Sequence, residues 1–166
     1  MQPEATTGQA VNAAPHPLAE LLACPPETGK LLNGSARSVE VKAGESVFRQ
    51  SEACEGLYVV VAGEFVRKAE RKQARVTLGQ VKAGDLVELA AALGDGRHTY
   101  TLTAVSPASL LLLPMGALQQ AFEAYPPLRM QLLEELAREV SRAYNACRIT
   151  RLMAARHRSS CAATGR

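Results

Sequence analysis

The chain has 166 residues and a formal net charge of +3. At this length a single domain can bury about two thirds of the surface that the unfolded chain exposes. The hydrophobic share is 47% and the aromatic share only 4%, so we expect a core of aliphatic side chains. The modest charge does not by itself indicate nucleic-acid binding, and no stretch approaches the roughly 20 apolar residues of a membrane-spanning helix.

The four cysteines are far apart in the sequence and form no C-x-x-C pair; they are Cys24, Cys54, Cys147 and Cys161. The N-terminus has no basic segment followed by an apolar one, which a secretory signal would require. We therefore expect reduced, isolated thiols in a cytoplasmic protein that does not enter the membrane.

The N-terminal region predicts a tail followed by short helices. Residues 1–17 are rich in Ala, Thr, Gln, Gly and Pro and lack a periodic apolar pattern, which predicts a disordered tail. Leu18–Ala23 predicts a short helix that ends before two prolines, and Pro26–Leu32 predicts another helical turn.

The stretch from Val39 to Gly63 predicts short strands separated by turns. Apolar pairs at 39–41 and 47–48 flank a glycine turn, and Leu57–Val61 is an apolar, mostly β-branched run that suits a buried strand. Gly63 allows a sharp reversal into the next strand. Such closely spaced strands are typical of a small β-sandwich or jelly roll.

Two further features lie between residues 65 and 96. Residues 65–72 and 74–81 predict a hairpin with a basic tip, which we interpret as a solvated end because no aromatic residues are interleaved with the charges. Leu86–Leu93 is rich in alanine and leucine and predicts a short helix, halted at the glycines 94 and 96.

The C-terminal part changes from a strand period to a helix period. Strands are predicted at 98–105 and 110–113, where apolar residues alternate or run continuously. A short helix is predicted at Met115–Ala124. A long helix then begins at the prolines 126 and 127 and reaches Arg156.

The first half of this pattern resembles a cyclic-nucleotide-binding domain, the sensor module of the cAMP receptor protein/FNR superfamily. The matching residues are Gly44-Glu45, Val47-Phe48, Glu52, Cys54, Leu57-Tyr58-Val59-Val60 and Gly63. The resemblance implies a mainly β jelly roll (double-stranded β-helix) with short N-terminal helices and a long C-terminal helix. The expected organisation is a disordered tail (1–17), a β-roll sensor domain (18–125), a long dimerisation helix (126–156) and a flexible tail (157–166).

The resemblance also implies where a ligand would bind. The family holds its ligand with a glycine-glutamate pair, a short helix and an arginine nine or ten residues after the glutamate; Glu88 and Arg97 have this separation. Helix amides and an arginine fork would hold a phosphate, while the carboxylate accepts a ribose hydroxyl. The implied ligand-binding residues are Glu88, Leu89, Ala90, Arg97 and His98.

Two departures from the family pattern leave the register open. Val87 stands where the family has glycine before the glutamate. His98-Thr99-Tyr100 follows Arg97, where the family has a small hydroxyl residue and then alanine. If the strand register follows the downstream leucines, His98 rather than Arg97 occupies the arginine position, because a slip of one residue reverses the face of each side chain.

Other chemistries have weaker support. A jelly-roll metal enzyme needs several histidines converging with a carboxylate, whereas His16, His98 and His157 come from separate segments. The sequence lacks a G-x-S-x-G motif and a paired-carboxylate arrangement. We therefore expect no enzymatic activity, no metal site and no cofactor. A cyclic nucleotide is a candidate ligand, and haem held by His98 is an alternative.

The long C-terminal helix predicts a homodimer. Apolar and small residues recur at spacings of three and four along one stripe, which consists of Leu133, Leu136, Val140, Ala143 and Cys147. The alternative is that this stripe covers the chain's own β-roll. The residues after the helix are too few for a helix-turn-helix, so sequence-specific DNA binding is not expected from this chain alone.

These observations predict a non-catalytic sensor or regulatory module that binds a phosphate-bearing small molecule in the β-roll and signals through its C-terminal helix. The alternatives are a structural interaction scaffold with a degenerate, filled pocket, a transcription regulator without its DNA-binding domain, and a haem-type sensor.

Overall fold

A computed structural model of the chain describes residues 18–163, with side chains described as far as residue 145. The predicted tail over 1–17 lies outside the described residues. In chain order the elements are α1 (Leu18–Leu21), α2 (Pro26–Ser35), β1 (Arg37–Val41), β2 (Ser46–Phe48), β3 (Gly56–Ala62), β4 (Glu64–Arg71), β5 (Ala74–Lys82), β6 (Leu86–Val87), α3 (Leu89–Leu93), β7 (Thr101–Ala104), β8 (Ala108–Pro114), α4 (Met115–Ala124) and α5 (Pro127–Ala163).

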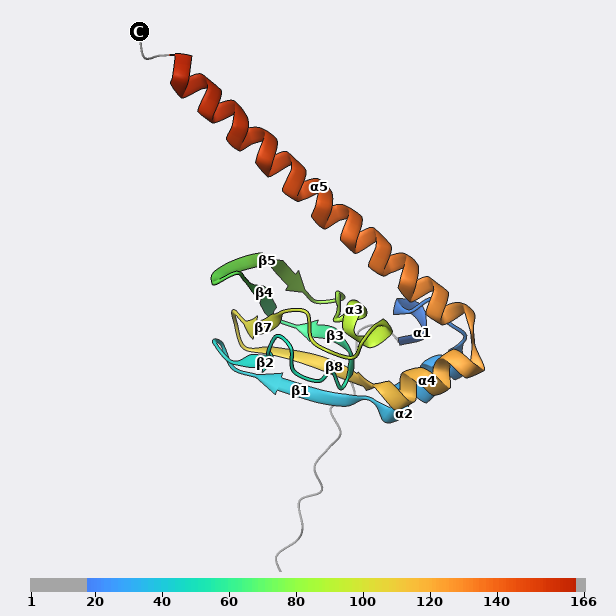
Figure 1. Cartoon of the computed structure of the whole chain (residues 1–166). Helices are drawn as coiled ribbons and strands as arrows, with labels where there is room; N and C mark the ends of the chain where they lie inside the picture. Colours follow the sequence, from blue (N-terminus) through green and yellow to red (C-terminus); the bar gives the residue numbers. More distant parts are fainter. Residues whose placement is uncertain (1–17, 164–166) are drawn as a thin grey trace, which may run out of the picture.

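The strands form two facing antiparallel sheets, which together make a β-roll (Figure 1). The first sheet has the order β1-β8-β3-β6 and the second β2-β7-β4-β5. Several sheet neighbours are far apart in sequence, such as β1 and β8, so the roll is closed by long-range pairing. The prediction of a mainly β jelly roll with a long C-terminal helix is confirmed.

Strand β3 is buried on both faces, which explains its continuous apolar sequence. Leu57 and Val59 pack with the helices, whereas Tyr58 and Val60 point into the space between the two sheets. All four side chains are at most 5% exposed. Because side chains alternate in direction along a strand, this one segment contributes to two separate cores.

The helices cover the outer face of the first sheet and connect it to α5. Helices α2 and α4 pack against each other and against β8, and Leu118 of α4 is buried among them. Leu128 and Leu132 anchor the first turns of α5 in the same core. From there α5 passes α3 and extends away from the roll (Figure 1). It continues beyond the predicted end at Arg156, to Ala163.

The prediction of a helix over Leu86–Leu93 was partly wrong. Leu86 and Val87 form strand β6, which pairs with Val59 and Tyr58 of β3, and only Leu89–Leu93 is helical. Helix propensity reflects only residues that are close in sequence. Here the pairing of β6 with the distant strand β3 outweighs it. The break between strand and helix falls at Glu88, whose φ is 72°.

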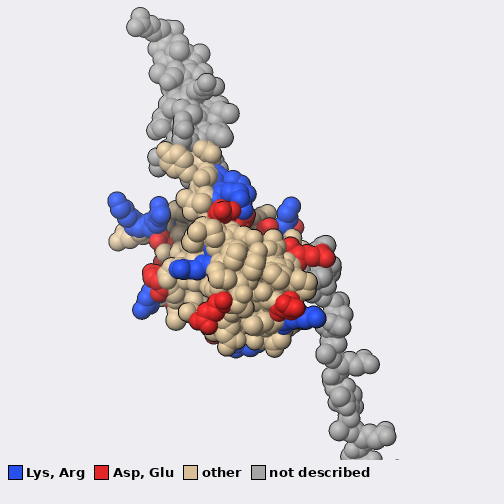
Figure 2. Space-filling view, turned by 90° about the vertical axis from the view of Figure 1, so that its right-hand side faces the viewer, with Lys and Arg blue, Asp and Glu red and all other residues tan. Residues whose placement is uncertain are grey.

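Charged side chains are distributed without a dominant sign. On the face shown in Figure 2, acidic and basic groups are interspersed around an uncharged centre formed by other residue types. Within the part of the chain that the structure describes, no helix has an apolar stretch long enough to cross a bilayer.

Candidate functional site

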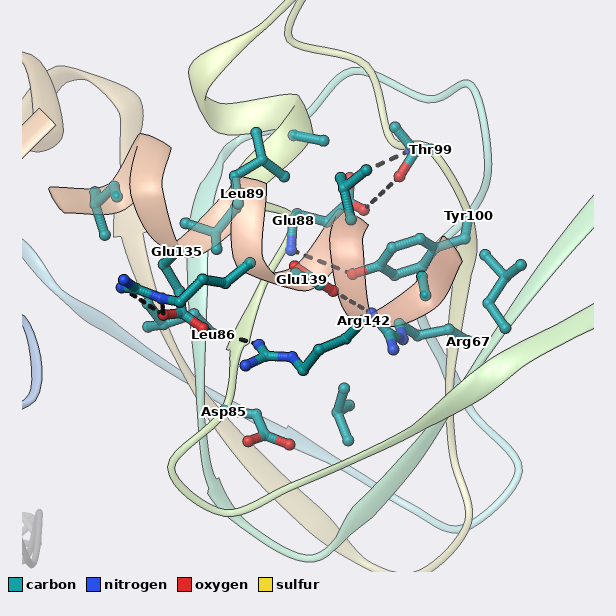
Figure 3. Close-up of a pocket in the computed structure, with 18 of the residues that line it drawn as sticks. Arg67, Asp85, Leu86, Glu88, Leu89, Thr99, Tyr100, Glu135, Glu139 and Arg142 are labelled. Atoms are coloured by element: carbon teal, nitrogen blue, oxygen red, sulfur yellow. Dashed lines mark hydrogen bonds and ion pairs between the residues drawn. The ribbon is translucent and has the colours of Figure 1, made fainter. Parts of the chain in front are cut away.

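A groove of about 1200 Å³ lies between the β-roll and α5 (Figure 3). Its walls come from the β4–β5 hairpin, the segment around β6 and α3, and one face of α5. The polar residues that line it include Arg67, Asp85, Glu88, Thr99, Tyr100, Glu135, Glu139 and Arg142, and the apolar ones include Leu78, Leu86, Leu89, Leu136 and Val140.

Glu88 lies at the inner end of this groove and is 2% exposed. Its Oε2 lies 2.8 Å from Nδ1 of His98, and Thr99 donates to the same carboxylate from its backbone N–H (3.3 Å) and its hydroxyl (3.1 Å). These contacts hold a residue whose left-handed backbone conformation is unfavourable for most residues other than glycine. The carboxylate that the resemblance assigned to a ribose hydroxyl is therefore already hydrogen-bonded to other residues of the chain.

His98 points into the roll. Its side chain is buried, with 4% of the residue exposed, and its ring stacks on Phe48 with 3.7 Å between centroids and 4° between planes. The structure therefore places His98, rather than Arg97, at the inward position opposite Glu88. Of the two registers that the sequence left open, the structure has the one that follows the downstream leucines.

Arg97 lies on the outside of the roll. The residue is exposed, its backbone bridges to Ala53, and its Nη1 donates to the carbonyl oxygen of Ser51 at 3.0 Å. Gly96, with φ of 71°, allows the turn that presents Arg97 to this edge. The remaining predicted residues, Leu89 and Ala90, both line the groove, and Leu89 also belongs to the core. A ligand-binding role for these five residues stays a prediction.

Tyr100 closes the end of the groove beside Glu88. Its hydroxyl accepts a hydrogen bond from the backbone N–H of Glu88 at 3.2 Å, so this amide at the start of α3 already has a partner. Burial, and then the nearby charge of Glu88, raise the pKa of Tyr100 well above its ordinary range. The phenol therefore remains neutral and fills space that the smaller alanine of the family pattern would leave open.

Sequence reasoning missed Arg67, the most enclosed cation of the groove. Its guanidinium lies 5.6 Å from the ring centroid of Tyr100 and forms an ion pair with Glu139 of α5. The two side chains are only 19% and 31% exposed. Among the described residues, Nε of Arg67 is buried and has no hydrogen-bond partner.

A usable signal for Arg67 was present in the strand period. Phe65 and Ala69 of the same strand are buried, and alternate residues of a strand share a face. Arg67 lies between them and must point to the same side. Interpreting all the basic residues of this hairpin as a solvated tip overlooked that alternation.

The residues predicted to form a dimer seam differ in their surroundings. Leu136 packs against the core and, with Val140 and Ala143, lines the groove. Leu133 is 36% exposed, and Val140 is 59% exposed at the edge of the groove. The side chain of Cys147 lies outside the described residues, and the interface stays a prediction.

The family model described as "Cyclic nucleotide-binding domain" matches residues 38–125. This match covers more than half of the chain, and the protein therefore belongs to the cyclic nucleotide-binding domain family. The family resemblance found in the sequence is confirmed.

Individual proteins are similar to this chain in sequence or in fold. Patatin-like phospholipase domain-containing protein 7 of Mus musculus is 30% identical over 105 residues, which are 61% of this chain and 8% of that protein. The chain thus spans a small part of that relative. The sensor domain of the transcriptional regulator DNR from Pseudomonas aeruginosa is 22% identical with a TM-score of 0.65, covering 79% of this chain and 87% of that one. The catabolite activator protein of Thermus thermophilus is 21% identical with a TM-score of 0.68, covering 81% and 63%.

Proposed function

We propose that this chain is a non-catalytic regulatory module that binds a phosphate-bearing small molecule in the groove and transmits binding through α5. The family membership supports a regulatory role. The main support for this ligand site is the position of Arg67, which is largely enclosed, lies over the ring of Tyr100 and forms an ion pair with Glu139 of α5.

Arg67 is suited to hold an anion because its guanidinium has an unused donor. Nε is buried without a partner, while Nη1 contacts Glu139. A phosphate accepts hydrogen bonds from two nitrogens of one guanidinium, a geometry that a lysine does not provide. A phosphate on Arg67 would satisfy Nε and compete with the carboxylate of Glu139 for the rest of the group.

This competition links the ligand to the helix. Glu139 is the acidic partner through which α5 contacts the second sheet, and Arg142 and Glu135 form another ion pair further along the groove wall (Figure 3). A ligand that takes Arg67 from Glu139 stabilises a position of α5 in which this contact is broken. Such a shift requires that the ligand bind the two helix positions with different affinity.

The exposed apolar residues of α5 support the proposal that the module is a homodimer. Large apolar side chains recur on this helix, and four of them are at least 36% exposed: Met130, Leu133, Val140 and Tyr144. With Ala137, their spacings alternate between three and four, as in the seam of a coiled coil. A second copy of the helix would cover this stripe, so that movement of α5 reaches the partner.

The second candidate is an interaction scaffold without a ligand. It is favoured by Glu88, whose carboxylate is already engaged by His98 and Thr99, and by Tyr100, which occupies the amide at the start of α3. In that case the β-roll would present α5 to a partner in one fixed position.

Calorimetric titration of the full chain with cAMP, cGMP and cyclic dinucleotides distinguishes the two candidates. We expect saturable binding that weakens at least about tenfold in Arg67→Met, since a charge-assisted hydrogen bond is lost. Arg97→Met should bind within about twofold of the original chain, because Arg97 lies on the outside of the roll and Arg67 takes its expected role in the proposed site. Loss of binding in Arg97→Met alone would contradict the site, and absence of binding to every nucleotide would favour the scaffold.

A further inference from the structure

Three potential metal ligands converge inside the β-roll, beyond the inner end of the groove. Cys54 comes from the loop between β2 and β3, Glu88 from the junction of β6 and α3, and His98 from the segment before β7. One ligand atom from each lies within 4.8 Å of the other two. We propose that Cys54, Glu88 and His98 form a binding site for a divalent transition-metal ion, with Zn²⁺ as the best match.

The spacing of the ligand atoms suits such an ion. Zn²⁺ binds sulfur at about 2.3 Å and nitrogen or carboxylate oxygen at about 2.0 Å, so the ligands of one tetrahedral ion are roughly 3.3–3.7 Å apart. Nδ1 of His98 and Oε2 of Glu88 are 2.8 Å apart. The ion therefore needs these two atoms to separate by about half an ångström and the sulfur to lie in the same range of distances from both.

The charges balance without a further partner. A thiolate and a carboxylate together neutralise a divalent cation, which makes its burial acceptable in a site where Glu88 and His98 are almost inaccessible. Cys54 releases its thiol proton to water when the ion binds. With Nδ1 as the ligand, neutral His98 carries its proton on Nε2.

Neighbouring groups already fix the orientation of two of the ligands. Thr99 holds the carboxylate of Glu88 from its backbone N–H and its hydroxyl, and Phe48 stacks on the His98 ring. Metal sites depend on this kind of outer support for their ligands. Three protein ligands leave a fourth coordination position of Zn²⁺ for water or a small anion.

Co²⁺ titration tests the proposal, because a Co²⁺–thiolate bond produces a charge-transfer absorption band. In a chain with Cys24, Cys147 and Cys161 replaced by serine, only the Cys54 thiol remains. We expect one equivalent of Co²⁺ to produce the band and Zn²⁺ to remove it. The matched chain that retains only Cys24 should give no band.

Variants of His98 and of its neighbour Thr99 should lower the affinity for Co²⁺ to different extents. His98→Gln should lower Co²⁺ affinity by about 100-fold or more, and Thr99→Val by about tenfold to 100-fold through its support of Glu88. Absence of the band in the Cys54-only chain, or unchanged affinity in His98→Gln, would overturn the site. Should His98→Gln fail to fold, the melting temperature decides: Zn²⁺ should raise it in the original chain and not in Cys54→Ser, and equal rises in both would overturn the proposal.

Discussion

Glu88 and His98 form a buried pair in which a carboxylate oxygen and an imidazole nitrogen lie 2.8 Å apart, and both side chains are almost completely enclosed. The same carboxylate accepts two hydrogen bonds from Thr99. The pair joins the junction of β6 and α3 to the segment before β7. It also removes from the groove the carboxylate that the family pattern offers to a ligand.

Removing the charge of Glu88 tests this arrangement. Glu88→Gln keeps the shape but turns an amide group toward the donors of Thr99 and His98, which leaves buried groups without a proper partner. We expect the free energy of unfolding in urea to fall by about 1–3 kcal/mol. The exposed Glu123→Gln should change it by less than about 0.5 kcal/mol. Equal stability of the two variants would show that the carboxylate is not held in this way.

Replacing two glycines that have nearly the same φ distinguishes the cost of backbone strain from the cost of a steric clash. Gly63 and Gly44 have φ of 82° and 85°. A Cβ on Gly63 would lie 2.5 Å from Cβ of Ala108, whereas nothing lies within 4 Å of one on Gly44. Thermal or urea unfolding should show a loss of about 1 kcal/mol for Gly44→Ala and about 3 kcal/mol for Gly63→Ala. Similar losses in the two variants would mean that the β3–β4 turn does not pack against Ala108 in this way.

Adjacent leucines test how α5 faces the domain. Leu132 is 4% exposed within the core, and Leu133 is 36% exposed. Leu132→Ala should cost about 3 kcal/mol of unfolding free energy because it leaves a cavity, while Leu133→Ala should cost less than about 1 kcal/mol. The reverse order would mean that the helix is rotated about its axis.

The proposed dimer depends on the exposed stripe of α5. Val140→Glu places a charge in this stripe, and we expect light scattering to report the mass of a dimer for the original chain and of a monomer for the variant. Val105→Glu, at an exposed apolar residue between β7 and β8, should remain dimeric. A dimer that persists in Val140→Glu would contradict the seam.

Much of the fold follows from local sequence patterns. The strand β3 was predicted correctly from its unbroken apolar, mostly β-branched run, and the helix Met115–Ala124 from its helical period. The two-residue strand β6 was not, because it exists only through its pairing with β3. A helical propensity shared by Leu86 and the alanines that follow could not reveal that pairing.

The candidate site was harder to predict for a related reason. The nine-residue separation of Glu88 and Arg97 matches the family pattern, but the turn at Gly96 presents Arg97 to the outside and His98 to the inside. Arg67 and Cys54 come from segments distant from Glu88, and only the closure of the roll brings them near it. Motif spacing thus located the region of the site, whereas long-range pairing determines which side chains face it.

In the proposed regulation, an anionic ligand competes with Glu139 for Arg67. Calorimetric titration of Glu139→Gln with cAMP tests it directly, because removal of the competitor should tighten binding. We expect the affinity to rise about fivefold, as for the loss of an ion pair worth about 1 kcal/mol. Glu134→Gln, an exposed glutamate of the same helix, should leave it unchanged. Weaker or equal binding by Glu139→Gln would rule out this competition.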